Sequence, residues 1–386
     1  MMHSYRFHRI VFRIGHFLAV PYLKLKFRYT YDALPQKIGP YLLLANHNTD
    51  FDPLFVGAAC GSQVYFVATE KILRMGALSS LVMALFRPII HYKGKTGISS
   101  VKEILNKLRE GKSVALFPEG NRSFNGLTGK FLSSTGKMAK RSGASLVTYR
   151  LHGGYFTSPR WSATLRKGRI RGELVHIYTP EMLKAMSEQE VNEAIRKDLY
   201  VDAYQEQQQE LTSFRGKELA LGLESTLFRC PSCGSISTLS SEDDRLKCSC
   251  CGFSAVYDVY GYLHDHNGRQ WTVTELDRLQ REAVQSLAGY DPELLLFSDR
   301  VLVENIGSSH EVLSSEPMLL KAYSDRLMFQ DMTVFLADIT GMAINQRNLL
   351  IIHTKDSRHF ELSGDISFSA LKYLYLYQSN TENTHE

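Results

Sequence analysis

The sequence has no apolar stretch long enough to cross a membrane as a helix. None of its 386 residues belongs to an uninterrupted apolar run approaching the roughly 20 residues that a membrane span needs. A secretory signal is not expected either, because Arg13 and His16 interrupt the apolar residues near the N-terminus and no small-residue cleavage site follows. The length instead predicts a globular chain of two or three domains.

Acidic residues are missing from the first 30 positions, although the whole chain holds 40 of them. The same segment interleaves apolar side chains with the cations Arg6, Arg9, Arg13, Lys24, Lys26 and Arg28. Basic and apolar residues in this pattern are typical of a helix that lies on an anionic membrane surface. We therefore predict that residues 1–35 form a basic amphipathic segment, and the competing interpretation is a basic helix packed on the body of the same protein.

Cysteine is scarce, with six residues in the chain, and five of them fall within residues 230–251. Cys60 stands apart in an apolar helical context and reads as a small buried hydrophobe. The clustered five predict a metal site in a reducing compartment and not a disulfide framework.

Two Cys-x-x-Cys-Gly knuckles organise this cluster, with Gly234 and Gly252 as the matching glycines. Their spacing predicts a structural zinc ribbon over residues 226–262, because four thiolates close the coordination sphere of zinc. The predicted ligands are Cys230, Cys233, Cys248 and Cys251. Cys250 is left out, iron is the minor alternative metal, and no nucleic-acid partner is expected because residues 241–244 are acidic.

Short apolar runs alternate with helical patterns between residues 36 and 215. Strands are expected at 41–45, 64–68, 113–117, 145–151 and 173–178. A capping-box pattern predicts a helix that begins at Ser100, and a second such pattern predicts one that begins at Ser187. Strands alternating with helices indicate an α/β domain with a mostly parallel sheet flanked by helices.

The pattern of apolar and polar residues changes toward the C-terminus. Short alternating runs parted by turn residues predict a β-rich domain over residues 290–378, closed by a helix near its end. A small barrel or sandwich fits this pattern, with a pleckstrin-homology-like domain as the candidate.

Polar residues follow the first expected strand directly, in the stretch from Asn46 to Asp52. A histidine can take a proton from a hydroxyl at neutral pH, and a carboxylate on its far nitrogen orients it. Asp52 lies five residues after His47, which suits such a pair. Asp52 also precedes Pro53, and Asp-Pro is a common start of a helix, so capping alone explains it equally well. Asp50 is an alternative partner, but no further ligand completes a metal site there.

A second polar stretch, Phe117-Pro118-Glu119-Gly120-Asn121-Arg122-Ser123, follows the expected strand at 113–117. Pro118 and Gly120 predict an unusual turn in which glycine takes a positive φ. Arg122 offers a planar fork suited to phosphate, and the competing interpretation is an internal Glu119–Arg122 ion pair. Ligands of open α/β sheets bind beyond the strand carboxyl ends, where both stretches are expected.

Together these two stretches resemble the signatures of the 1-acylglycerol-3-phosphate acyltransferase family, a His-x4-Asp box followed by a Phe-Pro-Glu-Gly-x-Arg-Ser box. The likeness covers roughly residues 35–215, here with an added zinc ribbon and a C-terminal domain. It implies His47 and Asp52 as catalytic residues, and Glu119, Gly120 and Arg122 as substrate-binding residues.

Between the boxes the family has an arginine that helps to bind the acceptor phosphate. By position this chain has Lys93, with Arg87 as a nearby alternative. Lysine keeps the charge but loses the bidentate fork. The family's Val-Pro pair is also replaced here by residues 146–149, and its lysine after the second box has no clear match.

The resemblance implies an enzyme of phospholipid synthesis that acylates lysophosphatidic acid, working as a peripheral protein on the cytoplasmic face of a membrane. The donor would be acyl-CoA or acyl-ACP, and no catalytic metal would be needed. Two alternatives remain: the same chemistry on glycerol 3-phosphate or another lysolipid, and a catalytically degenerate lipid-binding regulatory protein.

Overall fold

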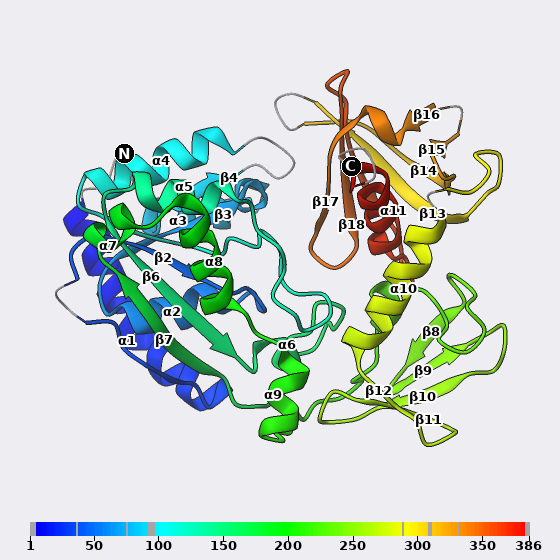
Figure 1. Ribbon diagram of the computed structural model, residues 1–386, viewed down its shortest axis with the longest axis horizontal. Coiled ribbons are helices and arrows are strands. Elements are labelled where there is room, and N and C mark those ends of the chain that lie inside the picture. The colour runs from blue at the N-terminus through cyan, green and yellow to red at the C-terminus, as the bar shows by residue number, and fades with distance from the viewer. Residues whose placement is uncertain are drawn as a thin grey trace. The chain divides into compact units, whose positions relative to one another are not determined.

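The chain divides into two units in a computed structural model that describes residues 5–35, 38–74, 76–91, 97–287, 289–307, 311–330 and 332–382. The first unit comprises Met1–Pro159 and Arg166–Arg215, and the second comprises Arg160–Leu165 and Gly216–Glu386. Figure 1 shows the two units with their elements labelled.

The first unit is built on a seven-stranded sheet with the strand order β1-β7-β6-β2-β5-β3-β4. Strands β6, β2, β5, β3 and β4 run parallel, whereas β7 pairs antiparallel with β6, and β1 follows β7. The strands are β1 (Thr30–Tyr31), β2 (Tyr41–Ala45), β3 (Val64–Thr69), β4 (Ile89–His91), β5 (Ser113–Leu116), β6 (Ser145–His152) and β7 (Arg171–Tyr178). The predicted α/β class with a mostly parallel sheet is confirmed, and β1 and β4 are additional strands.

Helices cover both faces of this sheet. They are α1 (Tyr5–Phe27), α2 (Asp52–Cys60), α3 (Ala77–Leu85), α4 (Ile98–Arg109), α5 (Ser134–Arg141), α6 (Gly154–Thr157), α7 (Pro180–Ala185), α8 (Glu188–Leu199) and α9 (Ala203–Gln209), with a 3₁₀ turn at Glu70–Arg74. Leu43 and Ala45 of β2 pack against α1 and α2 on one face. Leu42 and Leu44 pack against α4, α5, α7 and α8 on the other. Because both faces of β2 are buried, its sequence is uniformly apolar.

The two predicted capping boxes have different outcomes. Ser187 accepts a hydrogen bond from the backbone of Glu190, whose side chain accepts one from Ser187 in return, so this box is confirmed. The box at Ser100 is wrong, because α4 begins earlier, after Gly97 in a left-handed conformation. The Ser100 hydroxyl donates to the Gly97 carbonyl from inside the first turn.

Helix α1 packs on the body of the first unit with one face and exposes the other. His8 contacts the Tyr65 hydroxyl at 3.0 Å, His16 donates to the Ala58 carbonyl at 3.0 Å, and Leu23 and Phe27 are buried. The exposed face carries the apolar residues Ile10, Ile14, Phe17, Leu18, Tyr22 and Leu25. No helix within the described ranges is long and apolar enough to span a membrane.

The second unit holds two β-sheets. A five-stranded antiparallel sheet has the order β12-β11-β10-β9-β8. Its strands are β8 (Leu239–Glu242), β9 (Arg245–Cys248), β10 (Ser254–Tyr257), β11 (Leu263–Asp265) and β12 (Gln270–Trp271), preceded by a 3₁₀ turn at Leu223–Ser225 and followed by α10 (Val273–Leu287).

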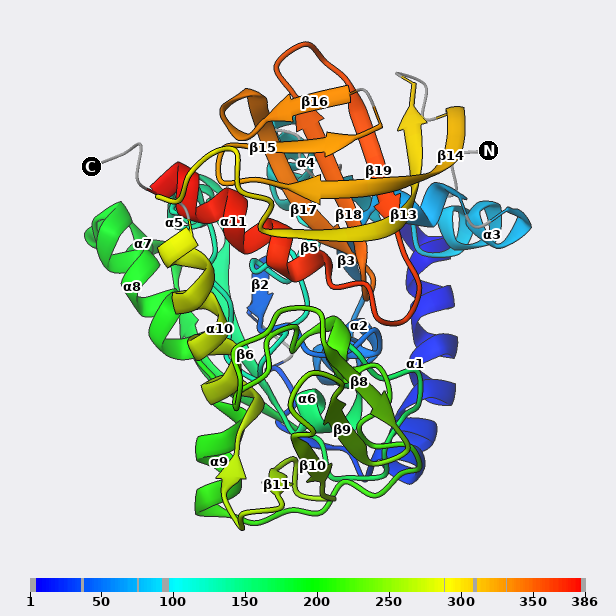
Figure 2. The same cartoon turned by 90° about the vertical axis from the view of Figure 1, so that its right-hand side faces the viewer.

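The other sheet is a seven-stranded antiparallel one with the order β16-β15-β14-β13-β19-β18-β17. Its strands are β13 (Phe297–Ile306), β14 (Val312–Ala322), β15 (Arg326–Phe329), β16 (Met332–Phe335), β17 (Ile339–Asn345), β18 (Leu349–Thr354) and β19 (His359–Ser363), with a 3₁₀ turn at Leu336–Asp338 and a closing helix α11 (Ala370–Glu382). Helix α11 lies against this sheet (Figure 2). The pleckstrin-homology-like assignment stays a prediction.

Within this unit, Lys372 of α11 joins the seven-stranded sheet to the segment that precedes β8. Its buried ammonium group pairs with Asp299 of β13 at 2.7 Å and donates to the Ser237 hydroxyl at 2.5 Å. A charge so deeply buried is tolerated only with such partners.

Candidate active site

The two polar stretches lie side by side at the carboxyl end of the sheet. Each follows one of two neighbouring parallel strands, His47 after β2 and Glu119 after β5. The Ser123 amide donates to the His47 carbonyl at 3.0 Å, which joins the two loops through their backbones. The meeting of the two stretches that the sequence predicts is therefore present.

His47 and Asp52 form a hydrogen-bonded pair, with 2.8 Å between Nδ1 and Oδ2. Asp52 is 1% exposed, and the His47 ring is 21% exposed and stacks on the Phe117 ring, with 4.5 Å between their centroids. Nε2 of His47 has no hydrogen-bond partner within the described part of the chain. The imidazole is thus anchored on one side and open on the other, as a general base must be.

Asp52 accepts every hydrogen bond that reaches it. Oδ2 also accepts from the amides of Asn48, at 2.6 Å, and Thr49, at 2.9 Å, and Oδ1 accepts from the Thr49 hydroxyl at 2.6 Å. A carboxylate that only accepts requires His47 to carry its proton on Nδ1, which leaves a lone pair on Nε2. Helix α2 begins at Asp52 without a side-chain cap, so the capping interpretation of this residue is wrong.

Glu119 joins the two loops by accepting hydrogen bonds from backbone amides. One carboxylate oxygen accepts from the His47 amide at 2.7 Å, and the other accepts from the Gly129 amide at 2.5 Å. Burial raises the pKa of Glu119 to about 8, against the opposing effect of these two amides. Within the described residues Glu119 forms no ion pair with Arg122, so the competing interpretation of the second stretch is wrong.

Arg122 pairs with Asp50, with 3.4 Å between Nη1 and Oδ2. The Arg122 side chain is 14% exposed whereas Asp50 is 81% exposed, so the guanidinium is largely buried and the carboxylate lies in solvent. Asp50 therefore points to Arg122 and is not the partner of His47. Gly120 has the predicted positive φ, at +66°, and its amide donates to the Phe117 carbonyl.

The two candidates for the cation between the boxes have separate outcomes. Lys93 follows β4 but lies outside the described residues. Arg87 precedes β4, which runs parallel to β3, so it lies at the amino edge of the sheet, away from His47. Its charge acts there on Tyr65, Lys107 and Glu110. The structure does not bring Arg87 to the site, because an arginine placed before a parallel strand faces the opposite edge.

Three further residues support the site and were not singled out from the sequence. The Asn46 side chain donates to the Leu151 carbonyl at 2.9 Å and accepts from the Leu151 amide at 2.7 Å, so it extends the pairing of β2 with β6. Thr49 orients Asp52, and Phe117 stacks on His47. Asn46, Thr49 and Phe117 all lie within or directly beside the two motifs, which was the available signal.

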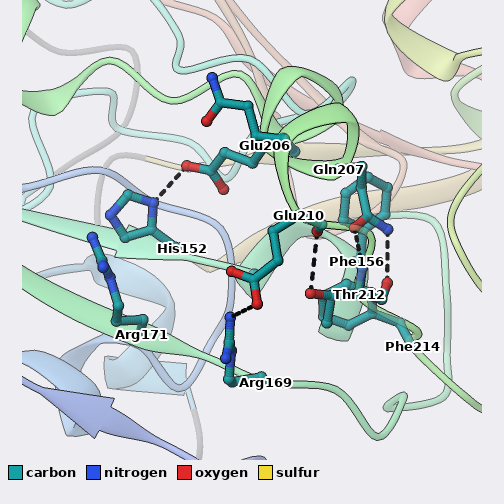
Figure 3. A pocket seen from close by; sticks show the side chains of 12 residues that line it. His152, Phe156, Arg169, Arg171, Glu206, Gln207, Glu210, Thr212 and Phe214 are labelled. Atoms are coloured by element: carbon teal, nitrogen blue, oxygen red, sulfur yellow. Dashed lines mark hydrogen bonds and ion pairs between the residues drawn. The ribbon is translucent and has the colours of Figure 1, made fainter.

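A concavity of about 240 Å³ opens at the same end of the sheet, beyond His152 at the end of β6 (Figure 3). His152 is bracketed by Glu206 and Glu173, at 2.5 Å and 2.8 Å. Arg169 pairs with Glu210 at 2.5 Å, as the dashed line in Figure 3 shows. His152 and Arg169 of this concavity thus already have carboxylate partners.

In the second unit, the four predicted thiols gather into one group. The sulfur atoms of Cys230, Cys233, Cys248 and Cys251 all lie within 4.8 Å of one another, a set that leaves out Cys250. Two of the separations are 3.7 Å and 3.8 Å. Zn–S bonds of about 2.3 Å in a tetrahedron place sulfurs about 3.8 Å apart. The cluster therefore fits a tetrahedral metal ion.

The two knuckles are built alike. The Gly234 amide donates to the Cys230 carbonyl at 3.0 Å, and the Gly252 amide donates to the Cys248 carbonyl at 3.1 Å. Both glycines have a positive φ, +76° and +73°, a conformation that glycine adopts without strain. Each turn thereby directs its two thiols toward one point.

Comparisons with known proteins find similarity to acyltransferases. A family model described as Acyltransferase matches residues 26–152. The 1-acyl-sn-glycerol-3-phosphate acyltransferase of Borreliella burgdorferi is 23% identical over 112 residues, 29% of this chain and 45% of that protein. The chloroplastic 1-acyl-sn-glycerol-3-phosphate acyltransferase LPAT1 of Arabidopsis thaliana is 23% identical over 169 residues, 43% of this chain and 47% of that protein.

The chain thus spans about half the length of these curated relatives. Among solved structures, the acyltransferase PlsC of Thermotoga maritima aligns with a TM-score of 0.42 and 16% identity, over 49% of this chain and 76% of that one. The family match contains the whole His47–Asp52 and Glu119–Arg122 constellation. The unit that holds this site therefore belongs to the acyltransferase family, in which the 1-acyl-sn-glycerol-3-phosphate acyltransferases are its relatives.

Proposed function

We propose that the first unit transfers a fatty acyl group from an acyl thioester to the free hydroxyl of lysophosphatidic acid. The observation that carries this proposal is the His47–Asp52 pair, whose imidazole is anchored through Nδ1 and open at Nε2. Arg122, in the second of the two joined loops, supplies the charge that a phosphate on the acceptor requires.

In the proposed reaction, His47 Nε2 takes the proton of the acceptor hydroxyl as its oxygen attacks the thioester carbonyl. The C–O bond of the new ester forms, the C–S bond breaks, and the proton passes from Nε2 to the departing thiolate. Asp52 stabilises the imidazolium in between. Base catalysis of this kind contributes roughly 10²–10⁴-fold, and positioning supplies much of the rest.

Arg122 and Gly120 would border the acceptor phosphate, and Lys93 is proposed as a second cation there. Glu119 acts through other groups: by holding the His47 and Gly129 amides it positions the loop that carries the base. We therefore assign it a positioning role and not direct contact with the substrate.

The test is acyl transfer by purified protein carrying His47→Gln, assayed with lysophosphatidic acid and with both acyl-CoA and acyl-ACP. We expect kcat to fall by about 10²-fold or more. His264→Gln is the matched control, since His264 also pairs with an aspartate, Asp258 at 2.8 Å, but belongs to the second unit. Turnover that survives in His47→Gln would refute the mechanism.

Two other functions are distinguishable in the same assay. If transfer to glycerol 3-phosphate or to another lysolipid is faster than transfer to lysophosphatidic acid, that molecule is the acceptor and the proposed reaction chemistry still applies. No transfer with any acceptor or donor would favour a lipid-binding regulatory protein. The open Nε2 of His47 argues for an active enzyme.

We also propose that the protein binds the cytoplasmic face of an anionic membrane through α1. Phe17, Leu18 and Leu25 are 77%, 64% and 88% exposed on the face of α1 that turns away from the body. Liposome flotation should show weaker binding for Phe17→Ser combined with Leu25→Ser. Leu211→Ser, at a 61% exposed leucine elsewhere in the unit, is the control.

For the second unit we propose that the four-thiol cluster holds a structural zinc ion. Zinc would cross-link the two knuckles and stabilise the ribbon without taking part in the reaction. Metal analysis of the purified chain should find about one zinc per chain, and Cys230→Ser should lose it. Cys250→Ser is the control, and zinc well below one per chain would refute the proposal.

A further inference from the structure

A second concavity, an open hollow of roughly 460 Å³, lies at the carboxyl end of α1. It is lined by Tyr22, Leu25, Lys26, Arg28, Lys167 and Gly168. Three of these six residues are cations and none is an acid. All six belong to the first unit, so the concavity is formed within one body.

The cations of this concavity have no counter-charge. Lys26, Arg28 and Lys167 form no ion pair with any of the residues that the structure describes. Two arginines nearby in the sequence do form ion pairs: Arg169 pairs with Glu210 at 2.5 Å, and Arg171 pairs with Glu173 at 3.2 Å. Unneutralised charge that converges on one hollow favours an anionic ligand.

Arg28 adds a conformational observation. It follows the last residue of α1 with a φ of +47°, the left-handed conformation that glycine usually supplies at this place. An arginine here keeps a strained backbone, and the residue lines the concavity.

Apolar surface adjoins the same concavity and indicates a lipid. Tyr22 is 48% exposed and Leu25 is 88% exposed, and both continue the apolar face of α1 through Ile14, Phe17 and Leu18. A free phosphate has no use for such surface, whereas a lipid in a bilayer presents a phosphate above apolar chains.

The concavity also lies at the end of the sheet that carries the active site. The Ile170 amide donates to the Phe27 carbonyl, which joins the end of α1 to the start of β7. Because β7 is antiparallel to β6, it starts at the edge where β6 and β2 end. Phe27 packs on Phe51, next to Asp52, with 5.1 Å between the ring centroids.

We propose that this concavity binds the phosphate headgroup of an anionic phospholipid in the bilayer, through Lys26, Arg28 and Lys167. The inference rests on the membrane association proposed above and names its headgroup site. An anchored headgroup here sets the catalytic edge of the sheet against the membrane, where a lysolipid acceptor resides. The site is separate from Arg122, which borders the acceptor itself.

The test measures vesicle binding by the full chain carrying Lys26→Ala and Lys167→Ala. The probes are vesicles of phosphatidylcholine mixed with phosphatidylglycerol, and vesicles of phosphatidylcholine alone. We expect binding to the anionic vesicles to weaken about fivefold for each cation removed, with binding to neutral vesicles unchanged. The charge-matched control is Lys184→Ala with Lys197→Ala, two exposed lysines of the same unit.

Each other result overturns the proposal. Equal losses in the two double variants would mean a diffuse effect of net charge. Protection of the wild type against thermal unfolding by inorganic phosphate, absent from the Lys26/Lys167 variant, would assign the concavity to a free anion. A raised KM for either substrate in neutral detergent micelles would assign it to substrate binding.

The readout is independent of catalysis. A chain that shows the expected loss on anionic vesicles but transfers no acyl group would refute the proposed reaction and keep this site. If the wild-type chain transfers acyl groups but the Lys26/Lys167 variant binds anionic vesicles as well as the wild type does, the proposed reaction stands and this headgroup site is refuted.

Discussion

At the scale of single residues, the carboxylates of Asp52 and Glu119 both hold His47 in place, one at the ring and the other at the backbone. The Asp52 carboxylate accepts a hydrogen bond from the His47 ring, and the Glu119 carboxylate accepts one from the His47 backbone amide. Between them the imidazole has little freedom to turn, which is the condition for efficient proton transfer. Their replacements should therefore affect turnover more than substrate affinity.

Asp52→Asn should lower kcat by roughly 10²–10⁴-fold with little change in KM, because a neutral amide cannot stabilise the imidazolium or secure the tautomer of His47. Steady-state kinetics on the purified variant gives both constants. Asp50→Asn is the contrast on the same loop: its carboxylate contacts Arg122, so its effect should appear in KM. A KM effect alone in Asp52→Asn would contradict the assignment.

Glu119 should make stability depend on pH. Its pKa is about 8 in the folded chain against an ordinary value of 4.5. Between these values the folded state binds more protons than the unfolded state, so the free energy of unfolding falls as pH rises. Urea unfolding from about pH 5 to pH 8 should show a shallower decline for Glu119→Gln than for the wild type. Parallel declines would contradict this.

At the scale of elements, the short helix α6 packs closely against the loop that follows β2 and holds His47. Helix α6 approaches the loop after β2 so closely that a Cβ on Gly154 would stand 2.9 Å from Cβ of Asn48 and 3.3 Å from Cγ2 of Thr49. Thr49 in turn donates to Asp52. Glycine at the start of α6 thus lets the loop that carries His47 pack closely against this helix.

Gly154→Ala should therefore displace this loop and lower kcat by on the order of 10- to 100-fold while the unit stays folded. Circular dichroism and kinetics measure the two effects separately. The control is Gly15→Ala in α1, where the added Cβ would meet nothing within 4 Å. That change should leave kcat intact and stabilise the helix by up to about 1 kcal/mol.

At the scale of the whole molecule, the chain passes between its units three times. Residues 160–165, inside the first half of the sequence, belong to the second unit. Trp161 is fully buried against Tyr257, and Arg160 donates to the carbonyls of Gln346 at 2.7 Å and Ile344 at 3.1 Å. The second unit is therefore completed by a segment of the first half of the chain.

Trp161→Ala should destabilise the second unit by about 3–5 kcal/mol, the usual range for a fully buried tryptophan. Hydrogen–deuterium exchange should accelerate in β10, β17 and β18, with β2 and β5 unchanged. Leu165→Ala, at a 37% exposed leucine of the same segment, is the control and should cost far less. Faster exchange confined to the first unit would contradict the assignment.

Local signals predicted much of this molecule. Every predicted strand of the first domain is present. Four of the five are parallel strands, whose apolar runs stand out in the sequence, and the fifth, β7, is antiparallel to β6. The pairing of His47 with Asp52 and the turn of each knuckle follow from spacings of a few residues. The two knuckles themselves meet across longer separations, from Cys233 to Cys248 and from Cys230 to Cys251. Ser187 formed its capping box, whereas Ser100 did not, since a glycine three residues earlier started the helix first.

The sequence by itself determined which reactive side chains stand at each strand end and in each knuckle, because these residues lie close together along the chain and local turns place them. Only the tertiary structure decided which groups face each other across long separations. It turned Glu119 onto backbone amides, left Arg87 at the opposite edge of the sheet, gave α1 one packed and one exposed face, and inserted Trp161 into the second unit. Burial and strand direction decide these contacts, and both are properties of the folded chain and not of any short segment.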